Sequence, residues 1–142
     1  MKKELQDELF NACPLLYRFR HQKDQSKGLR NLMELGICCE DGWYQLLLDA
    51  SIGIEEVINQ IKHTGYEEKL LPTAIWVKER NGELHIYMEN ENTEISQIVA
   101  EAISKSTKIC ERCGEKGKMR IKNGISCRCD NCYDASLLDI EN

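Results

Sequence analysis

The sequence predicts an α+β fold, with helices packed on a β-hairpin or a small antiparallel sheet and a compact cysteine-rich unit after them. Three observations carry this prediction. Apolar residues recur with helical spacing after Trp43, two β-rich runs flank Asn81 and Gly82, and two cysteine pairs lie in the last third of the chain. The order helix, helix, hairpin, helix is typical of an α+β core.

The composition is that of a globular protein. With 142 residues, 42% apolar and 30% charged, the chain can form one domain, or a core of about 100 residues with a small appendix. No stretch approaches the roughly 18 apolar residues of a membrane span, and the first residues show no secretory apolar run. We therefore expect a cytoplasmic protein without membrane contact.

A short helix is predicted at residues 2–13, because Leu5, Leu9 and Phe10 have helical spacing and Pro14 ends the run. The polar run at residues 21–27 predicts a loop. One or two turns of helix are expected from the apolar residues that follow this loop, which are Leu29, Leu32, Met33 and Leu35.

A long helix is predicted from Trp43 onward, with Gly53 as a candidate interruption. Its apolar residues fall at steps of three and four, so they share one face. They are Trp43, Leu46, Leu47, Ala50, Ile54, Val57, Ile58 and Ile61.

The clearest β-hairpin lies at residues 73–89, where Asn81 and Gly82 suit the positive φ angles of a type I′ turn. A hairpin alone is marginal in water, so it must pack against the helices. Asn92 or Thr93 then caps a further helix. The apolar stripe of that helix consists of Ile95, Ile98, Val99, Ala102 and Ile103.

Four cysteines after this helix have the spacing C-x2-C-x15-C-x2-C: Cys110, Cys113, Cys129 and Cys132. Two residues between cysteines let both thiolates turn toward one ion, and four thiolates suit tetrahedral zinc. Asn123 and Gly124 predict a second hairpin that brings the pairs together, and a short helix is expected to close the unit. We therefore predict one structural Zn²⁺ in a zinc-ribbon or treble-clef-like unit.

The expected division is an acidic α+β core at residues 1–105 and a four-cysteine zinc-binding unit at residues 106–142. Charge supports it: residues 105–132 hold eight basic and three acidic side chains, a net +5, while the whole chain is −5. Cys127 is an alternative to Cys129 as the third ligand, although C-x4-C is the rarer spacing. Four sulfur ligands leave no open position, so the metal should supply folding energy and not catalysis.

The other candidate residues favour structural roles. Unpaired Cys13, Cys38 and Cys39 are expected to be small buried hydrophobes, with a redox role for the vicinal pair as the alternative. The histidines, which are His21, His63 and His85, are far apart and lie in no metal or nucleophile motif. Phosphate loops, HExxH and Gly-x-Ser-x-Gly are absent, so we do not expect an enzyme.

Glu40 and Asp41 precede Gly42-Trp43-Tyr44. They could form a paired carboxylate site, but acidic residues before a helix also stabilise its N-terminal dipole, and the second interpretation is favoured. Glu40, Asp41, Trp43 and Tyr44 are also a candidate interaction segment.

Taken in order, Gly42-Trp43-Tyr44, the VKERNGELHIY hairpin at residues 77–87 and the Cys110-Glu-Arg-Cys113-Gly knuckle resemble a family of small uncharacterised phage and prophage proteins. Members show an acidic Gly-Trp-Tyr segment, a V-K-E-K-x-G-x-L-R-x-Y hairpin, a helix and a terminal C-x-x-C-G … C-x-x-C unit. The resemblance covers about residues 9–132 and implies a phage or prophage origin with no known activity. Glu40 stands where a small residue is usual, and His85 replaces the usual basic residue, which puts an anion contact there in doubt.

Three classes of function stay open. The first is a non-enzymatic protein-interaction module, acting on a host or phage protein, for example to counter a host defence or redirect host machinery. The second is nucleic-acid binding through the basic side chains of the zinc unit, and the third is an enzyme. The basic residues of the second class are Lys116, Lys118, Arg120, Lys122 and Arg128.

Overall fold

The computed structural model describes residues 1–22 and 31–141. Most of the loop predicted at residues 21–27, and Leu29 of the predicted helical turn, lie outside the described residues. The helices are α1 (Lys3–Ala12), α2 (Tyr44–His63), α3 (Thr93–Ser106) and α4 (Asp130–Glu141), with 3-10 turns η1 (Met33–Leu35), η2 (Asp41–Trp43) and η3 (Glu68–Leu70). The strands are β1 (Ile37–Cys38), β2 (Thr73–Arg80), β3 (Glu83–Glu89), β4 (Lys118–Arg120) and β5 (Ser126–Arg128). The fold is α+β, as predicted.

The larger sheet has the strand order β1-β2-β3. β2 and β3 form the predicted antiparallel hairpin, and Asn81 (φ 52°) and Gly82 (φ 80°) make its turn. β1 runs parallel to β2, with Ile37 opposite Val77. The sheet is therefore mixed and not purely antiparallel, because β1 adds a parallel pair to the antiparallel hairpin. The long connection between β1 and β2 allows this parallel direction.

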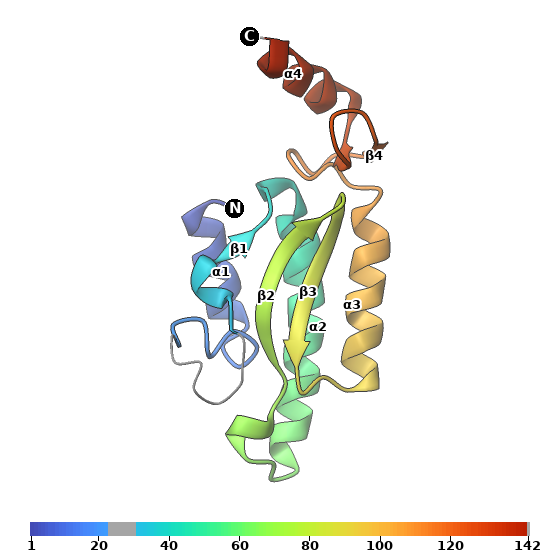
Figure 1. Cartoon of the computed structure of the whole chain (residues 1–142). Coiled ribbons are helices and arrows are strands. Elements are labelled where there is room, and N and C mark those ends of the chain that lie inside the picture. Colours follow the sequence, from blue (N-terminus) through green and yellow to red (C-terminus); the bar gives the residue numbers. More distant parts are fainter. Residues whose placement is uncertain (23–30, 142) are drawn as a thin grey trace.

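Two helices pack on one face of this sheet (Figure 1). α2 is continuous, and Gly53 does not interrupt it: an added Cβ there would lie 3.6 Å from Ile98 of α3, an ordinary contact distance between packed helices. The Asn92 side chain accepts a hydrogen bond from the backbone N–H of Ile95 and caps α3. The fully buried side chains that fill this core include Leu47, Ile54, Ile58, Val77, Leu84 and Ile95.

The segment after α1 is held by a buried carboxylate of α2. The two oxygens of Glu55 accept hydrogen bonds from the backbone N–H groups of Leu15 (2.9 Å) and Leu16 (2.7 Å). The hydroxyl groups of Tyr17 and Ser51 lie 2.7 Å apart in the same buried layer. Polar groups that are paired in this way can be buried without the penalty of a lost hydrogen bond.

The C-terminal unit lies beyond the turn end of the β2–β3 hairpin (Figure 1). β4 and β5 form a second two-stranded hairpin, and α4 follows. None of the helices in the described part of the chain has both the length and the apolar character that a membrane span needs. The division at residue 105 stays a prediction, because the two parts are joined by several contacts described below.

Candidate metal centre

Local structure brings the two cysteine pairs together. Cys110 and Cys113 occupy a tight turn after α3, in which Gly114 has a φ of 83°. The β4–β5 hairpin reverses the chain, and Asn123 and Gly124 form its turn with φ angles of 61° and 95°. Cys129 and Cys132 then lie just before and within the first turn of α4.

The four sulfur atoms form one cluster. The Sγ atoms of Cys110, Cys113, Cys129 and Cys132 all lie within 4.8 Å of one another, and those of Cys113 and Cys129 are 3.6 Å apart. Four sulfurs at about 2.3 Å from a tetrahedral ion would be separated by about 3.8 Å. The cluster is therefore of a size that fits a metal ion, and all four cysteines are free thiols.

The backbone around the cluster favours thiolate at one position. Burial alone would raise the pKa of the Cys110 thiol, but backbone N–H groups of Cys129, Cys113 and Arg112 lower it to about 6. Burial and the neighbouring sulfur groups raise the pKa of Cys132 to about 12. A thiolate thus forms readily at Cys110, and its charge opposes ionisation of Cys132 until a cation offsets it.

Cys127 lies apart from this cluster. Its side chain is fully buried among the apolar residues of the main core, and burial raises its pKa. Its backbone carbonyl accepts a hydrogen bond from the N–H of Glu111 (3.0 Å). Of the two candidates for the third position, Cys129 is the one whose sulfur joins the cluster.

The remaining cysteines divide into two kinds. Cys13 and Cys39 are buried hydrophobes as expected, and burial raises the pKa of each thiol to about 12. Cys38 is exposed, which corrects the expectation that all three are buried. Neighbouring residues of a strand point to opposite faces, so Cys38 and Cys39 of the β1 region cannot both enter the core.

The predicted interaction segment is engaged within the molecule. Trp43 is fully buried, and its indole Nε1 donates to the Ile109 carbonyl (2.9 Å). The remaining three side chains also have partners: Glu40 pairs with Arg128, Asp41 with Lys2, and Tyr44 donates to Glu8. Trp43 has no surface to offer a partner, and a partner contact at the other three stays a prediction.

Gly42 fixes the approach of this segment to the cysteine knuckle. Its N–H donates to the Glu111 carbonyl (2.7 Å), and an added Cβ would overlap the carbonyl oxygens of Cys110 and Glu111. The Glu111 side chain, which is buried, accepts from the N–H of Glu40 (3.1 Å). The start of α2 therefore docks directly on the loop that carries Cys110 and Cys113.

A cleft of about 210 Å³ lies beside the cysteine cluster. Four of the five basic residues predicted to bind nucleic acid line it, namely Lys116, Lys118, Arg120 and Arg128. Arg120 donates to an Asp130 oxygen (2.7 Å) and lies over the Tyr133 ring. Arg128 pairs with Glu40, so both arginines already have anionic partners. Lys122 does not line this cleft.

No second metal-like cluster of histidine, cysteine, aspartate or glutamate occurs among the residues that the structure describes. His85 lies 3.1 Å from a Glu83 oxygen and stacks on Tyr87.

Two surface features were not predicted from the sequence. Exposed aliphatic residues surround the β4–β5 turn, and a row of rings lies on the outer face of the β2–β3 hairpin, where period-two alternation of Trp76 with cationic residues was the available signal.

Comparisons with protein-family models, with curated proteins and with solved structures give no match for this chain. The resemblance to phage proteins therefore stays a prediction.

Proposed function

We propose that the four cysteines bind one zinc ion with a structural role in a treble-clef-like unit. The order of knuckle, β4–β5 hairpin and α4 supports this, since the last two sulfurs belong to the helix start. Thiolates are soft ligands that select zinc over hard cations, and four of them complete a tetrahedral shell. The metal then stabilises the unit and offers no position to a substrate.

Protein purified under reducing conditions without added metal should contain about one zinc per chain, bound by the four cysteine thiolates. Cobalt in its place should show the sulfur-to-metal absorption of a four-thiolate site. Reduced, folded protein that contains no metal and takes up none would contradict this proposal.

We further propose that the chain is a non-enzymatic protein-interaction module that uses the zinc unit as its contact surface. The observation that carries this is an apolar tip on the β4–β5 hairpin. Ile121 is 81% exposed, and Ile125 (46%) and Met119 (36%) adjoin it. An exposed group of aliphatic side chains on a small hairpin favours contact with an apolar surface of a protein partner, and it offers nothing to a phosphate group. The phage resemblance would make the partner a host or phage protein.

Replacement of both tip isoleucines tests this proposal, because aspartate at positions 121 and 125 removes the apolar contact without touching a ligand. A stoichiometric partner should lose affinity by more than tenfold for Ile121→Asp/Ile125→Asp. Ile52→Asp is the matched control, since Ile52 is 40% exposed on α2. Zinc content must remain unchanged in all variants. Equal retention of the partner by the tip variant would contradict the proposal.

The basic cleft favours nucleic-acid binding as the second candidate function. Lys116 and Lys118 are exposed beside the two paired arginines, with the Lys118 ammonium 3.9 Å from an Asp130 oxygen, and their positive charge suits phosphate. Binding of generic DNA or RNA that weakens steeply with salt, and that Lys116→Ala/Lys118→Ala reduces, would support it. Binding that does not depend on salt or on these lysines would exclude this cleft.

A further inference from the structure

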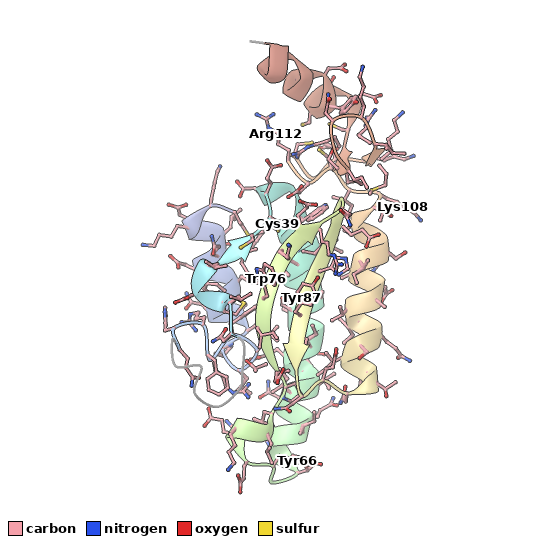
Figure 2. The ribbon with its side chains drawn as sticks, viewed as in Figure 1. Cys39, Tyr66, Trp76, Tyr87, Lys108 and Arg112 are labelled. Carbon is pink, nitrogen blue, oxygen red and sulfur yellow. The ribbon has the colours of Figure 1, made fainter. Side chains whose placement is uncertain are left out.

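The outer face of the β2–β3 hairpin carries aromatic and cationic side chains in register. Trp76 is paired with Tyr87, Lys78 with His85, and Arg80 with Glu83, so all of these side chains share one face. The opposite face, with Val77 and Ile86, is buried beneath α2 and α3. α2 runs behind the hairpin in Figure 1, and Figure 2 places Trp76 and Tyr87 across its two strands.

The three rings form a continuous row. The centroids of Trp76 and Tyr87 lie 5.6 Å apart with 31° between the ring planes, and those of Tyr87 and His85 lie 5.8 Å apart at 18°. Each ring is only partly buried. The Trp76 Nε1 is shielded from solvent and has no hydrogen-bond partner among the described residues. The Trp76 ring is therefore held with its N–H edge inward, while part of its surface stays exposed on this face.

Cations interleave with the rings. The Lys78 ammonium lies 4.4 Å from the Trp76 centroid, and Arg80 donates to the Tyr87 hydroxyl (3.2 Å). Glu83 on the same face is engaged by His85 at 3.1 Å. Lys78 and Arg80 thus place two positive charges beside flat ring surfaces.

The turn end of this face adjoins the basic zinc unit. A Cβ at Gly82 would overlap the Met119 side chain and lie 3.2 Å from the Ser126 carbonyl carbon. The cleft that contains Lys116 and Lys118 belongs to the same small unit. Lys78 and Arg80 share the hairpin face with the carboxylates of Glu83 and Glu89, and the adjoining unit adds the positive charge that is complementary to a polyphosphate chain.

We propose that this hairpin face binds single-stranded nucleic acid, with bases stacked on Trp76 and Tyr87 and phosphates beside Lys78 and Arg80. Rings interleaved with cations suit unpaired bases, whose faces are free to stack, and do not suit a duplex, whose bases are already stacked. A protein partner is disfavoured because none of the large exposed aliphatic side chains of the described residues lies on this face, whereas three of them lie at the zinc-unit tip. The basic cleft alone would bind any polyphosphate, whereas this face distinguishes single strands.

Tryptophan fluorescence gives a direct test, because the chain has two tryptophans and Trp43 is fully buried. Titration of the zinc-loaded full chain with oligo(dT) or oligo(U) should quench Trp76 saturably. A duplex of the same length should quench much less. Two phosphate contacts predict a slope of about −1.4 in log K against log[salt].

Variants separate stacking from charge. Trp76→Leu and Tyr87→Leu should each weaken binding of a dye-labelled oligonucleotide by about tenfold or more, the range expected for one stacked base. Tyr87→Phe keeps the ring and should retain most of the affinity. Tyr66→Leu is the control, since Tyr66 is 59% exposed and lies away from this face.

Absence of quenching and of oligonucleotide binding at low salt would overturn the proposal. So would binding that survives both leucine variants, which would assign the nucleic acid to the basic cleft. Protection of Trp76 by a protein partner without any oligonucleotide binding would also overturn it. The test can be kept separate from the apolar tip with Ile121→Ser/Ile125→Ser, which removes the aliphatic side chains without changing the charge and should leave oligonucleotide binding unchanged.

Discussion

The part of the chain before residue 105, called the core below, and the C-terminal unit after it differ in how much apolar surface they bury. Nearly all fully buried apolar side chains belong to the core, whereas Cys110 and Cys127 are the buried hydrophobic residues of the described part of the unit. The unit instead exposes Met119, Ile121 and Ile125. Hydrophobic burial can hold the core, but the unit buries too little apolar surface to offset its chain entropy.

The difference shows why the four-cysteine cluster and the docking contacts matter. A metal ion can supply the free energy that burial does not, and the contacts of Gly42 and Trp43 tie the unit to the start of α2. The unit is therefore expected to need metal in order to fold, whereas the core is stabilised by its own hydrophobic burial and should respond to metal only through its contacts with the unit. Variants and chelators can break or sharpen this contrast.

Metal removal should give the largest effect. Structural zinc contributes about 10–16 kcal/mol in small zinc-dependent units, so chelation should unfold the C-terminal unit. Hydrogen exchange with and without a strong chelator should show loss of protection at residues 110–133. Residues 75–77 and 95–103 should largely keep theirs. Equal loss in both regions would mean that the docking contacts make one cooperative unit.

The choice of third ligand should give the next largest effect. Cys129→Ser should release metal and disorder the unit, because three thiolates no longer complete the shell. Cys127→Ser should retain the metal and lower the free energy of unfolding by about 1–3 kcal/mol, since it places a hydroxyl in an apolar core. Zinc content and thermal melting measure both. Metal loss from Cys127→Ser alone would reverse the assignment.

A methyl group at Gly42 should test the joint between the two regions, by which we mean the contacts of Gly42 with Glu111 and of Trp43 with Ile109. Gly42→Ala would press a Cβ against the carbonyl groups of Cys110 and Glu111, and we expect a loss of about 1–3 kcal/mol together with faster zinc release. Gly53→Ala is the matched control, because its Cβ meets only ordinary contacts and should stabilise α2 by about 0.5–1 kcal/mol. Chelator-induced zinc release and thermal melting separate the two. Unchanged zinc release in Gly42→Ala would show that the joint does not support the metal site.

Most of the fold was predictable because its signals are local. The Asn-Gly turns specify both hairpins, helical periodicity specifies α2 and α3, and the cysteine spacing specifies the cluster. β1 was not predictable, since Ile37 and Cys38 form a strand only by pairing with Val77 and Lys78. The exposure of Cys38 follows from that strand, so it was missed with it.

The surroundings of the site were harder to predict than its ligands. Trp43 was a candidate contact residue, yet it is buried because its indole reaches the Ile109 carbonyl across the joint. The pairing of Glu40 with Arg128 likewise depends on how two distant segments meet. Such contacts have no spacing rule along the chain, whereas two cysteines separated by two residues do.

Loss of the α3 cap should give the smallest effect, and it tests whether the two regions unfold separately. The Asn92 side chain caps α3 by accepting from the Ile95 N–H at 2.9 Å, so Asn92→Ala should cost the core about 1 kcal/mol. The last turn of α3 leads to Cys110, but the cap lies at the opposite end of the helix. If metal alone holds the C-terminal unit, thermal melting of the core should fall while the rate of chelator-induced zinc release stays unchanged. A parallel increase in that rate would show that core stability is transmitted along α3 to the cluster, and the two regions would then form one cooperative structure.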